Sequence, residues 1–403
     1  MAQSSTARRV KSLYNPPSFI FKQAFSLAYH AWLTGWRGFP AWMFKGKKVL
    51  ATAAGATAIG CTGYPYHVVW EVTTRCNLNC IHCYAGSVES AKTELSTAEG
   101  RRLLEQIAAI DKVRMIVITG GEPLIRKDIF ELVEHAGKLG FRIVFSTNGT
   151  LLTPGMAKDL VRLGVVNFSI SLDGSSPERH ESIRRRSGCF QGALDGLKAA
   201  ATTGICVQVN FTAMKQNLSE LPGVIDLAES LHADIVMVFQ AIPPQGSSEK
   251  LELDPEEQMN LIKTIAEKQK KSHALIMPVC APEYWPWLVE QRRFSFSRNI
   301  QNKALSGCGA GKGFCYIRFD GEVWPCNFIP LSAGNVREKP FADIWNNSPL
   351  LKKFRVESRR LKGTCGECHY QSICGGCRGR AFAHSSDPLE ADPACLLQTQ
   401  NVL

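Results

Sequence analysis

The fold and the chemistry of this 403-residue chain are decided by residues 71–84, which read Glu71-Val-Thr-Thr-Arg-Cys76-Asn-Leu-Asn-Cys80-Ile-His-Cys83-Tyr84. Three cysteines follow a strand-like run at C-x3-C-x2-C spacing, so their sulfur atoms can point at one inorganic centre. A [4Fe–4S] cluster takes four thiolates, and this loop supplies three. One iron would keep an open position, which is typical of a catalytic metal site rather than a closed structural one. A structural metal knuckle or three buried thiols are the alternatives.

The region that contains this stretch alternates between strand and helix patterns. The strand-like runs are 67–73, 115–119, 142–146, 166–171, 206–213 and 235–239, and the helical stretches are 97–110, 129–139, 154–163, 192–203 and 218–231. Six such units with apolar strands predict an α/β fold in which helices cover a parallel sheet. Parallel α/β barrels carry their chemistry at the C-terminal ends of the strands, where the three cysteines lie.

The basic charge of the chain is concentrated at its start. The formal net charge is +11, yet residues 1–70 hold eight Lys or Arg and no Asp or Glu, so the remainder carries +3. Aromatic residues recur there at helical spacing: Phe21, Phe25, Trp32 and Trp36. A basic amphipathic helix of this kind can lie at a membrane surface, and an accessory helix packed on the barrel is the alternative. The apolar runs are too short and interrupted to predict a spanning helix. No nucleic-acid-binding motif accompanies the basic residues, so no nucleic acid is expected.

Polar motifs follow the next three strands. The second strand leads into Gly120-Gly121-Glu122-Pro123, where glycines permit close backbone approach and a carboxylate can accept hydrogen bonds from an ammonium group. The third ends in Ser146-Thr-Asn148-Gly and the fourth in Ser169-Ile-Ser171-Leu-Asp-Gly. Asn-Gly and Asp-Gly pairs also favour simple turns.

Together these motifs resemble the radical S-adenosylmethionine (radical SAM) superfamily, whose signature is C-x3-C-x-Φ-C; His82 fills the Φ position. The resemblance implies a partial (β/α)6 barrel and a [4Fe–4S] cluster on Cys76, Cys80 and Cys83 that binds SAM and cleaves it to a 5′-deoxyadenosyl radical. It also implies a set of cofactor-binding residues. These are Gly120, Gly121, Glu122, Ser146, Asn148, Ser171 and Arg184, with Glu122 on the SAM amino group and Arg184 on its carboxylate.

The C-terminal region is dense in cysteine. Of the fifteen cysteines in the chain, eight follow residue 306: Cys308, Cys315, Cys326, Cys365, Cys368, Cys374, Cys377 and Cys395. Without a secretory signal, so many clustered cysteines favour metal or cluster ligation over disulfides. Eight ligands suffice for two closed four-cysteine centres, and a zinc ribbon is the alternative. Cys61, Cys189, Cys206 and Cys280 lack ligand spacing; Cys280 lies in a linker and is an exception that could face the substrate.

This array resembles the SPASM extension of radical SAM enzymes, including Gly321 in its C-x9–15-G-x4-C element. The resemblance implies two auxiliary clusters. The first would use Cys308, Cys315, Cys326 and Cys377, and the second Cys365, Cys368, Cys374 and Cys395. The two-residue spacing between Cys374 and Cys377 is similar to that of the quinone-cofactor, mycofactocin and alternative haem-pathway branches. Asn327 stands where sulfatase-maturating members carry a catalytic Asp, so their general-base chemistry is not expected.

The sequence therefore predicts four units: 1–66, a helical extension; 67–240, the partial barrel; 241–305, a helix and an irregular Pro- and Trp-containing linker; and 306–403, the auxiliary-cluster domain. The predicted function is oxidative modification of a substrate by a radical SAM/SPASM enzyme. A peptide or protein is the first choice of substrate, a tetrapyrrole side chain the second and a lipid the third; a non-catalytic zinc or iron–sulfur scaffold is a remote alternative. A reductant such as flavodoxin or ferredoxin is expected as a partner. The expected location is the cytoplasm, with peripheral attachment to the inner membrane surface as the alternative.

Overall fold

The computed structural model describes residues 16–39, 67–84, 93–110, 115–243, 251–292, 297–305, 307–356 and 360–396. The strands are β1 His67–Glu71, β2 Met115–Thr119, β3 Arg142–Thr147, β4 Val165–Ser171, β5 Cys206–Ala213, β6 Ile235–Gln240, β7 Leu275–Val279, β8 Phe314–Ile317, β9 Glu322–Trp324 and β10 Gly334–Asn335. The helices are α1 Pro16–Thr34, α4 Thr97–Ala108, α5 Ile129–Lys138, α6 Pro154–Arg162, α7 Pro177–Arg184, α8 Cys189–Ala201, α9 Leu221–Ser230, α10 Pro255–Lys271, α11 Tyr284–Glu290, α12 Arg298–Ala304, α13 Phe341–Asn347, α14 Pro349–Val356, α15 Gly363–Glu367 and α16 Arg378–Ser385. Two 3₁₀ turns, η2 Pro123–Ile125 and η3 Leu218–Glu220, complete the set.

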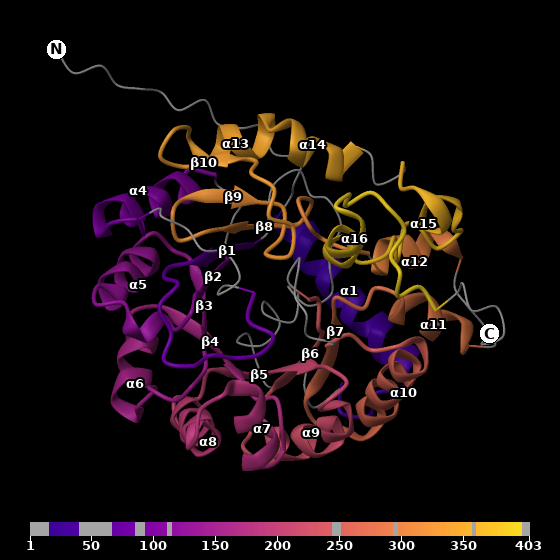
Figure 1. Ribbon diagram of the computed structural model, residues 1–403, viewed down its shortest axis with the longest axis horizontal. Helices are drawn as coiled ribbons and strands as arrows, with labels where there is room; N and C mark the ends of the chain where they lie inside the picture. Colours follow the sequence, from indigo (N-terminus) through magenta and orange to yellow (C-terminus); the bar gives the residue numbers. More distant parts are fainter. Residues whose placement is uncertain are drawn as a thin grey trace.

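The strands form one sheet in the order β10-β9-β8-β1-β2-β3-β4-β5-β6-β7. Strands β1 to β7 are parallel, and β8 pairs with β1 in parallel as well. Strands β9 and β10 add antiparallel pairs at that end. Helices α4 to α10 lie outside the strands in Figure 1, so the parallel sheet has a helix-covered outer face and an inner face. This arrangement confirms the predicted α/β fold with a parallel sheet and a cysteine-rich C-terminal region.

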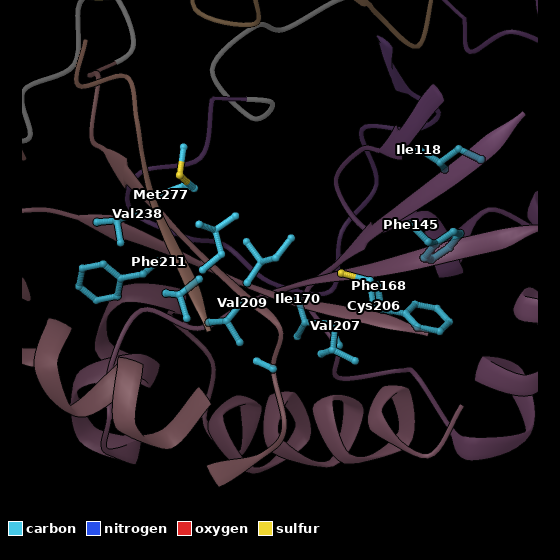
Figure 2. Close-up of a cluster of buried hydrophobic side chains, with 14 of the residues drawn as sticks. Ile118, Phe145, Phe168, Ile170, Cys206, Val207, Val209, Phe211, Val238 and Met277 are labelled. Carbon is cyan, nitrogen blue, oxygen red and sulfur yellow. The ribbon is translucent and has the colours of Figure 1, made fainter. Parts of the chain in front are cut away.

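The hydrophobic core lies between the outer face of the sheet and the helices that cover it. Side chains such as Phe168, Ile170, Val209, Phe211 and Val238 are fully buried between strands and helices (Figure 2). Helix starts are fixed by local chemistry. Capping boxes at Ser96 and at Asp254 open α4 and α10, because each cap oxygen accepts from the third helical N–H.

Residues 275–290, expected to be irregular, form a seventh parallel strand and helix α11. Strand β7 contains Pro278, which has no N–H to donate to a sheet ladder. Because β7 is the last strand of the sheet and pairs with β6 alone, proline is tolerated there. A proline such as Pro278 would be unfavourable in a central strand, but it is acceptable in this edge strand.

Helix α1 packs against α10, α11 and α12. Its buried side carries Leu27, His30 and Leu33, whereas Phe25 and Trp32 are 42% and 40% exposed. Arg292 fixes the end of the helix by donating to the backbone oxygen of Leu33 at 2.9 Å. The predicted aromatic face therefore points away from the body of the protein, except for the buried Trp36. Phe21 lies outside the residues whose side chains are described. Within the described part of the chain, no helix combines the length and the hydropathy needed to cross a membrane.

Candidate active site

The loop after β1 carries the three cysteines, and it is held against the end of α7. The backbone N–H groups of Asn79 and Ile81 donate to the carbonyl oxygens of Arg184 and Ile183, at 3.3 and 3.0 Å. Cys76 is exposed, and Cys80 and Cys83 are partly buried. Burial raises the pKa of Cys76, and the nearby charges of Glu122, Cys80 and Cys83 raise it further. The three thiols are thus gathered at the C-terminal end of β1, next to one another and to Glu122.

The two glycines after β2 allow their loop to lie directly on the cysteine loop. The N–H of Gly121 donates to the oxygen of Thr73 at 2.7 Å, and the N–H of Glu122 donates to that of Arg75 at 2.8 Å. A β-carbon at Gly121 would stand 2.4 Å from the oxygen of Arg75, which is far inside van der Waals contact. Glycine is required here by the close approach of two backbones.

Glu122 is fully buried between the ends of β2 and β3. Its carboxylate accepts hydrogen bonds from the hydroxyl of Thr147 at 2.8 Å and from the N–H of Asn148 at 2.8 Å. Burial raises the pKa of Glu122 to about 6, against the lowering effect of these donors. The carboxylate is therefore ionised at neutral pH and beside Cys76, where it could also meet a bound ammonium group.

Asn148 links the end of β3 to the cysteine loop. Its amide nitrogen donates to the side-chain oxygen of Asn77 at 2.8 Å and lies 3.9 Å from the sulfur of Cys76. Ser146 and Ser171, the other predicted contacts at strand ends, are both partly exposed on β3 and β4. The structure therefore brings Asn148 to the cysteines and places the two serines on neighbouring strands of the same sheet.

Arg184 ends α7 beside Cys80. One guanidinium nitrogen lies 3.5 Å from the Cys80 sulfur and another 2.6 Å from a carboxylate oxygen of Asp173. The ring of His82 approaches the same oxygen at 3.5 Å. Desolvation opposes the charge on Asp173, but Arg184 outweighs it and holds the pKa of that carboxyl below its usual range. Asp173, which the sequence analysis did not select, thus anchors both Arg184 and the Φ position of the motif.

The sequence-based prediction also missed a row of polar side chains on the inner face of the sheet. The amide of Asn210 donates to the hydroxyl of Ser169 at 2.7 Å, and the amide of Gln208 donates to it at 3.0 Å. The outer face carries Phe168, Ile170 and Val209 instead. Strict alternation of polar and apolar residues in β4 and β5 was the signal that could have identified this lining.

Aromatic side chains flank the cysteine loop on the side of β8. Tyr84 contacts the rings of Tyr316 and Phe328, with centroids 6.0 and 5.5 Å apart. Burial raises the pKa of Glu71 to about 7, although a hydrogen bond from Tyr316 lowers it. A cluster of flat rings therefore adjoins Cys83 through Tyr84, and the carboxyl group of Glu71 lies against the same rings.

In the C-terminal region, four cysteines line one cavity. Cys365, Cys368, Cys374 and Cys395 surround a space of about 380 Å³, which includes the open volume at its mouth, together with Glu283 and Asp392. These are the four residues predicted for the second auxiliary cluster. Within the described residues, no three His, Cys, Asp or Glu side chains converge as ligands of a single metal ion. A cubane spreads its thiolates over separate irons, and this four-thiol cavity fits such a group.

The residues predicted for the first auxiliary cluster are divided. Cys308, Cys326 and Cys377 lie close enough for their charges to act on one another. Cys315 is fully buried on β8 in the main core, where Arg355 is the charged group that affects its pKa. The structure therefore brings three of these four sulfurs together.

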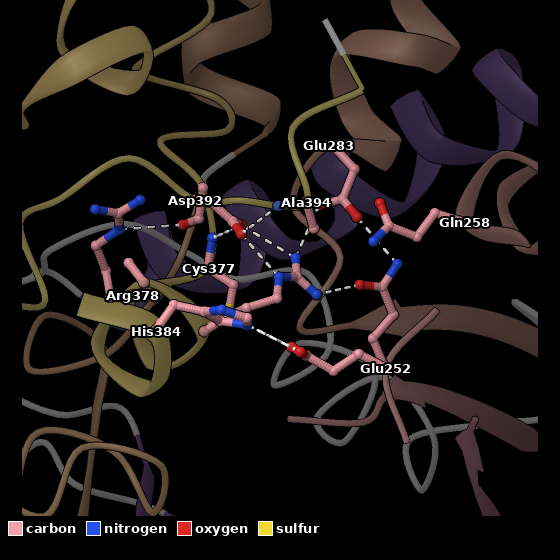
Figure 3. Close-up of polar contacts among 12 residues, drawn as sticks. Glu252, Gln258, Glu283, Cys377, Arg378, His384, Asp392 and Ala394 are labelled. Atoms are coloured by element: carbon pink, nitrogen blue, oxygen red, sulfur yellow. Dashed lines mark hydrogen bonds and ion pairs between the residues drawn. The ribbon is translucent and has the colours of Figure 1, made fainter. Parts of the chain in front are cut away.

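A buried ion-pair network joins this region to the parallel sheet (Figure 3). Arg380 donates to both carboxylate oxygens of Asp392, at 2.7 and 3.0 Å, and Asp392 also accepts from the N–H of Cys377 at 2.6 Å. Arg380 reaches Gln240 at the end of β6 and lies 3.6 Å from Glu283. The cysteines of the C-terminal region are thereby fixed relative to the ends of β6 and β7.

Comparison with known families explains this constellation. The family model of the radical SAM superfamily matches residues 70–228, and that of SPASM, an iron–sulfur cluster-binding domain, matches residues 308–369. An AdoMet-dependent heme synthase of Methanosarcina barkeri is 36% identical over 344 residues, which cover 84% of this chain and 98% of the relative. The chain belongs to the radical SAM superfamily. It is an enzyme with a SPASM domain, as predicted, and it binds a SAM-cleaving [4Fe–4S] cluster, SAM and auxiliary iron–sulfur clusters.

Other relatives of this radical SAM enzyme are named for different products. A pre-heme d1 synthase of Dinoroseobacter shibae and the mycofactocin maturase MftC of Mycobacterium tuberculosis are each 30% identical. They cover 82% of this chain, and the matches span 86% and 83% of those proteins. Among solved structures, SuiB of Streptococcus suis bound to S-adenosylmethionine has a TM-score of 0.68 at 19% identity, covering 86% of this chain and 80% of SuiB. At that identity the likeness establishes the fold.

Proposed function

We propose that this enzyme oxidatively modifies propionate side chains of an iron tetrapyrrole. The observation that carries the proposal is the extent of the similarity to AdoMet-dependent heme synthases. It spans 98% of the Methanosarcina barkeri protein, far beyond the cluster motifs. Relatives named for heme synthesis from two further organisms are 34% and 33% identical, and an Fe-coproporphyrin III synthase is 32% identical. This similarity supports a tetrapyrrole over the peptide that the sequence motifs alone favour.

The chemical class of the reaction follows from the two porphyrins named. Haem carries vinyl groups at two positions where Fe-coproporphyrin III carries propionates. Each conversion removes one hydrogen atom from the propionate chain, breaks the bond to the carboxylate carbon to release CO₂, and gives up one electron. When bound, the SAM cluster and SAM supply the hydrogen-abstracting radical, and the auxiliary clusters accept the electron.

The residues proposed to hold the SAM-cleaving cluster are Cys76, Cys80 and Cys83. Their donor set fits, since three neighbouring thiols lie beside the carboxylate of Glu122 and the guanidinium of Arg184. Glu122 would accept from the SAM amino group, and Asn148, Ser146 and Ser171 would orient the cofactor from the strand ends. Gly120 and Gly121 hold the Glu122 loop against the cysteine loop, which is supported by the lack of room for a β-carbon at Gly121.

The substrate would lie on the inner face of the sheet. The partly exposed rings of Tyr84 and Phe328, packed with the buried Tyr316, offer flat apolar surface beside Cys83, which suits a planar macrocycle. The partly exposed Asn210, held by Ser169 and Gln208 on β4 and β5, offers a hydrogen bond to a carboxylate oxygen. Glu71, whose pKa is raised to about 7, can hold a proton close to the site.

The test is direct. Enzyme purified and reconstituted without oxygen is given SAM, Fe-coproporphyrin III and dithionite, or reduced flavodoxin or ferredoxin as the proposed physiological donor. Mass spectrometry should reveal products that have lost CO₂ and two hydrogens for each propionate converted, with 5′-deoxyadenosine formed in step. If the porphyrin stays unchanged while substantial 5′-deoxyadenosine forms, the tetrapyrrole is rejected as the substrate, but the cleavage of SAM is confirmed.

A peptide remains the second candidate. Mycofactocin maturases are 30% identical over 82% of this chain, and SuiB, whose fold is shared, has been solved bound to its precursor peptide SuiA. Incubation with the mycofactocin precursor peptide in place of the porphyrin separates the two proposals. If the peptide is modified and the porphyrin is not, the peptide is favoured as the substrate.

We also propose that α1 attaches the enzyme to a membrane surface. Phe25, Tyr29 and Trp32 form a continuous stack on the helix, and Phe25 and Trp32 are its exposed members. Residues 1–70 contain eight basic residues and no acidic residue. Exposed aromatic rings beside positive charge suit an anionic bilayer surface.

A further inference from the structure

Cys280, which no motif selects, lies among the cysteines of the first auxiliary set. It follows directly after β7, at the C-terminal end of the last parallel strand. Its thiol donates a hydrogen bond to Cys377, which lowers the pKa of Cys377 and raises that of Cys280. The charge of Cys326 also acts on Cys280. Cys280 therefore contacts one of the three thiols that the structure has already gathered and lies within electrostatic range of a second.

Cys315 points in a different direction from those thiols. It pairs with Val68 in the β1–β8 register, and side chains of paired residues share a face of the sheet. The next position of β1 on that face, Trp70, meets Gly100 of helix α4, so this is the helix-covered face. Tyr316, one residue after Cys315, turns to the inner face and contacts Tyr84. Cys315 thus packs in the main core, whereas Cys326 and Cys308 belong to a separate cluster around Phe382.

The backbone at Cys280 is held in an unusual conformation. Its φ angle is +61°, in the left-handed region where residues with a β-carbon are strained. The same loop continues to Glu283, which lines the cavity of the second auxiliary set. The loop thus reaches both groups of sulfur atoms. Arg380, fixed by Asp392, adds positive charge that acts on both Cys280 and Cys377, as suits thiolates on a metal cluster.

We infer that the first auxiliary cluster is held by Cys280, Cys308, Cys326 and Cys377, with Cys280 in the place that spacing assigns to Cys315. Four thiols from four separate segments converge, Cys326 and Cys377 buried and Cys280 and Cys308 partly buried, and four is the number that a closed iron–sulfur centre needs. Cys280 gives up its proton to solvent as its sulfur binds iron, and no electron changes hands. The assignment rests on the SPASM domain of the chain and is independent of the substrate.

The experiment isolates the auxiliary clusters in the full-length chain. A background variant in which Cys76, Cys80 and Cys83 are all alanine removes the SAM-cleaving cluster, leaving about eight irons per chain, four for each [4Fe–4S] centre. In that background, Cys280→Ala should lower the iron and sulfide content by about half and remove one of two electron paramagnetic resonance signals after reduction. Cys315→Ala should keep both signals, as should Cys206→Ala, a matched buried thiol in the core.

A second variant guards against a folding defect. Cys280→Ser keeps the size of the side chain and offers an oxygen ligand, so the signal of the first auxiliary cluster should shift while that of the second stays unchanged. Full iron content and unshifted signals in both Cys280 variants would overturn the inference. So would loss of the first signal in Cys315→Ala, since the four-thiol set would then be the one expected from spacing.

Discussion

At the scale of single residues, the cysteine loop depends on a buried carboxylate that the motif does not contain. Asp173 binds Arg184 at 2.6 Å and His82 at 3.5 Å, and Arg184 in turn contacts Cys80. Asp173 is fully buried, so its removal would leave the guanidinium without its ionic partner in a site of low polarity. The Φ position and the second cysteine are therefore placed by one ion pair.

Asp173→Ala should lower the free energy of unfolding by about 3–5 kcal/mol, because breaking a buried ion pair strands the other charge. It should also lower the iron bound by the cysteine loop. Glu131→Ala is the control: it removes a partner of Arg101 in an exposed pair, where a change below about 1 kcal/mol is expected. Urea unfolding under anaerobic conditions measures both, and equal losses in the two variants would contradict this account.

Gly121→Ala should disturb the site through its backbone. The added β-carbon would collide with the oxygens of Arg75 and Thr74, so the cysteine loop must move. We expect at least a tenfold loss of SAM affinity, equivalent to about 1.4 kcal/mol. Gly155→Ala in α6 has space for the methyl group and should leave SAM affinity unchanged while gaining up to about 1 kcal/mol of stability. Isothermal titration with SAM compares them; unchanged affinity in Gly121→Ala would refute the packing argument.

At the scale of elements, α1 is docked through a histidine that burial keeps neutral. His30 is fully buried, contacts the ring of Trp285, and has no hydrogen-bond partner on either nitrogen within the described residues. Burial lowers the pKa of His30 to about 4. The folded state therefore binds fewer protons than the unfolded state below about pH 6.5, and stability is lost as the pH falls.

His30→Phe should reduce this loss. Between about pH 7.5 and pH 5.5 the histidine costs the wild type about 1 kcal/mol, because only the unfolded state gains the proton. The variant keeps an aromatic ring against Trp285 but cannot titrate. The difference in unfolding free energy between the two proteins, measured at both pH values, cancels the contributions of other groups. A difference that does not change with pH would show that His30 is solvated or already protonated.

The elements also show where sequence reasoning succeeds and where it ends. Strands 115–119 and 206–213 have the predicted bounds, since short apolar runs bounded by turns define buried parallel strands. Strand β7 was missed because Pro278 is acceptable only on an edge, and the edge is a property of the whole sheet. The cysteine motifs located the loop and the second auxiliary cavity. The partners of Asp173 and Cys280 could not be read from the sequence, because their contacts join segments about ten to a hundred residues apart.

At the scale of the whole molecule, the cysteine loop and the C-terminal cysteines lie at the same edge of the sheet, at the carboxyl ends of the parallel strands. The cysteine loop and the Glu122 loop follow β1 and β2, while the network of Arg380 ties the C-terminal cysteines to the ends of β6 and β7. The cysteines proposed to hold the auxiliary clusters are thereby fixed to the same end of the sheet as the proposed SAM site. An oxidative reaction, in which an electron must leave the substrate, suits this arrangement.

The attachment through α1 is a prediction about the whole molecule. Co-sedimentation with vesicles rich in phosphatidylglycerol should retain the full chain and release it as salt is raised, because the attraction is partly electrostatic. Phe25→Ser combined with Trp32→Ser should weaken binding at least tenfold without loss of fold, since both side chains are exposed. Vesicles of neutral lipid are the control. Equal binding of the wild type and the double variant would rule out the helix as the anchor.

The central claim is that Cys76, Cys80 and Cys83 hold the cluster at which SAM is cleaved. The most direct measurement is the yield of 5′-deoxyadenosine from reconstituted, dithionite-reduced protein given SAM, compared between the wild type and Cys76→Ala. The account predicts a clear yield from the wild type and none from the variant, which should still hold about eight of about twelve irons. A variant that still forms 5′-deoxyadenosine, or a fully loaded wild type that forms none, would contradict it.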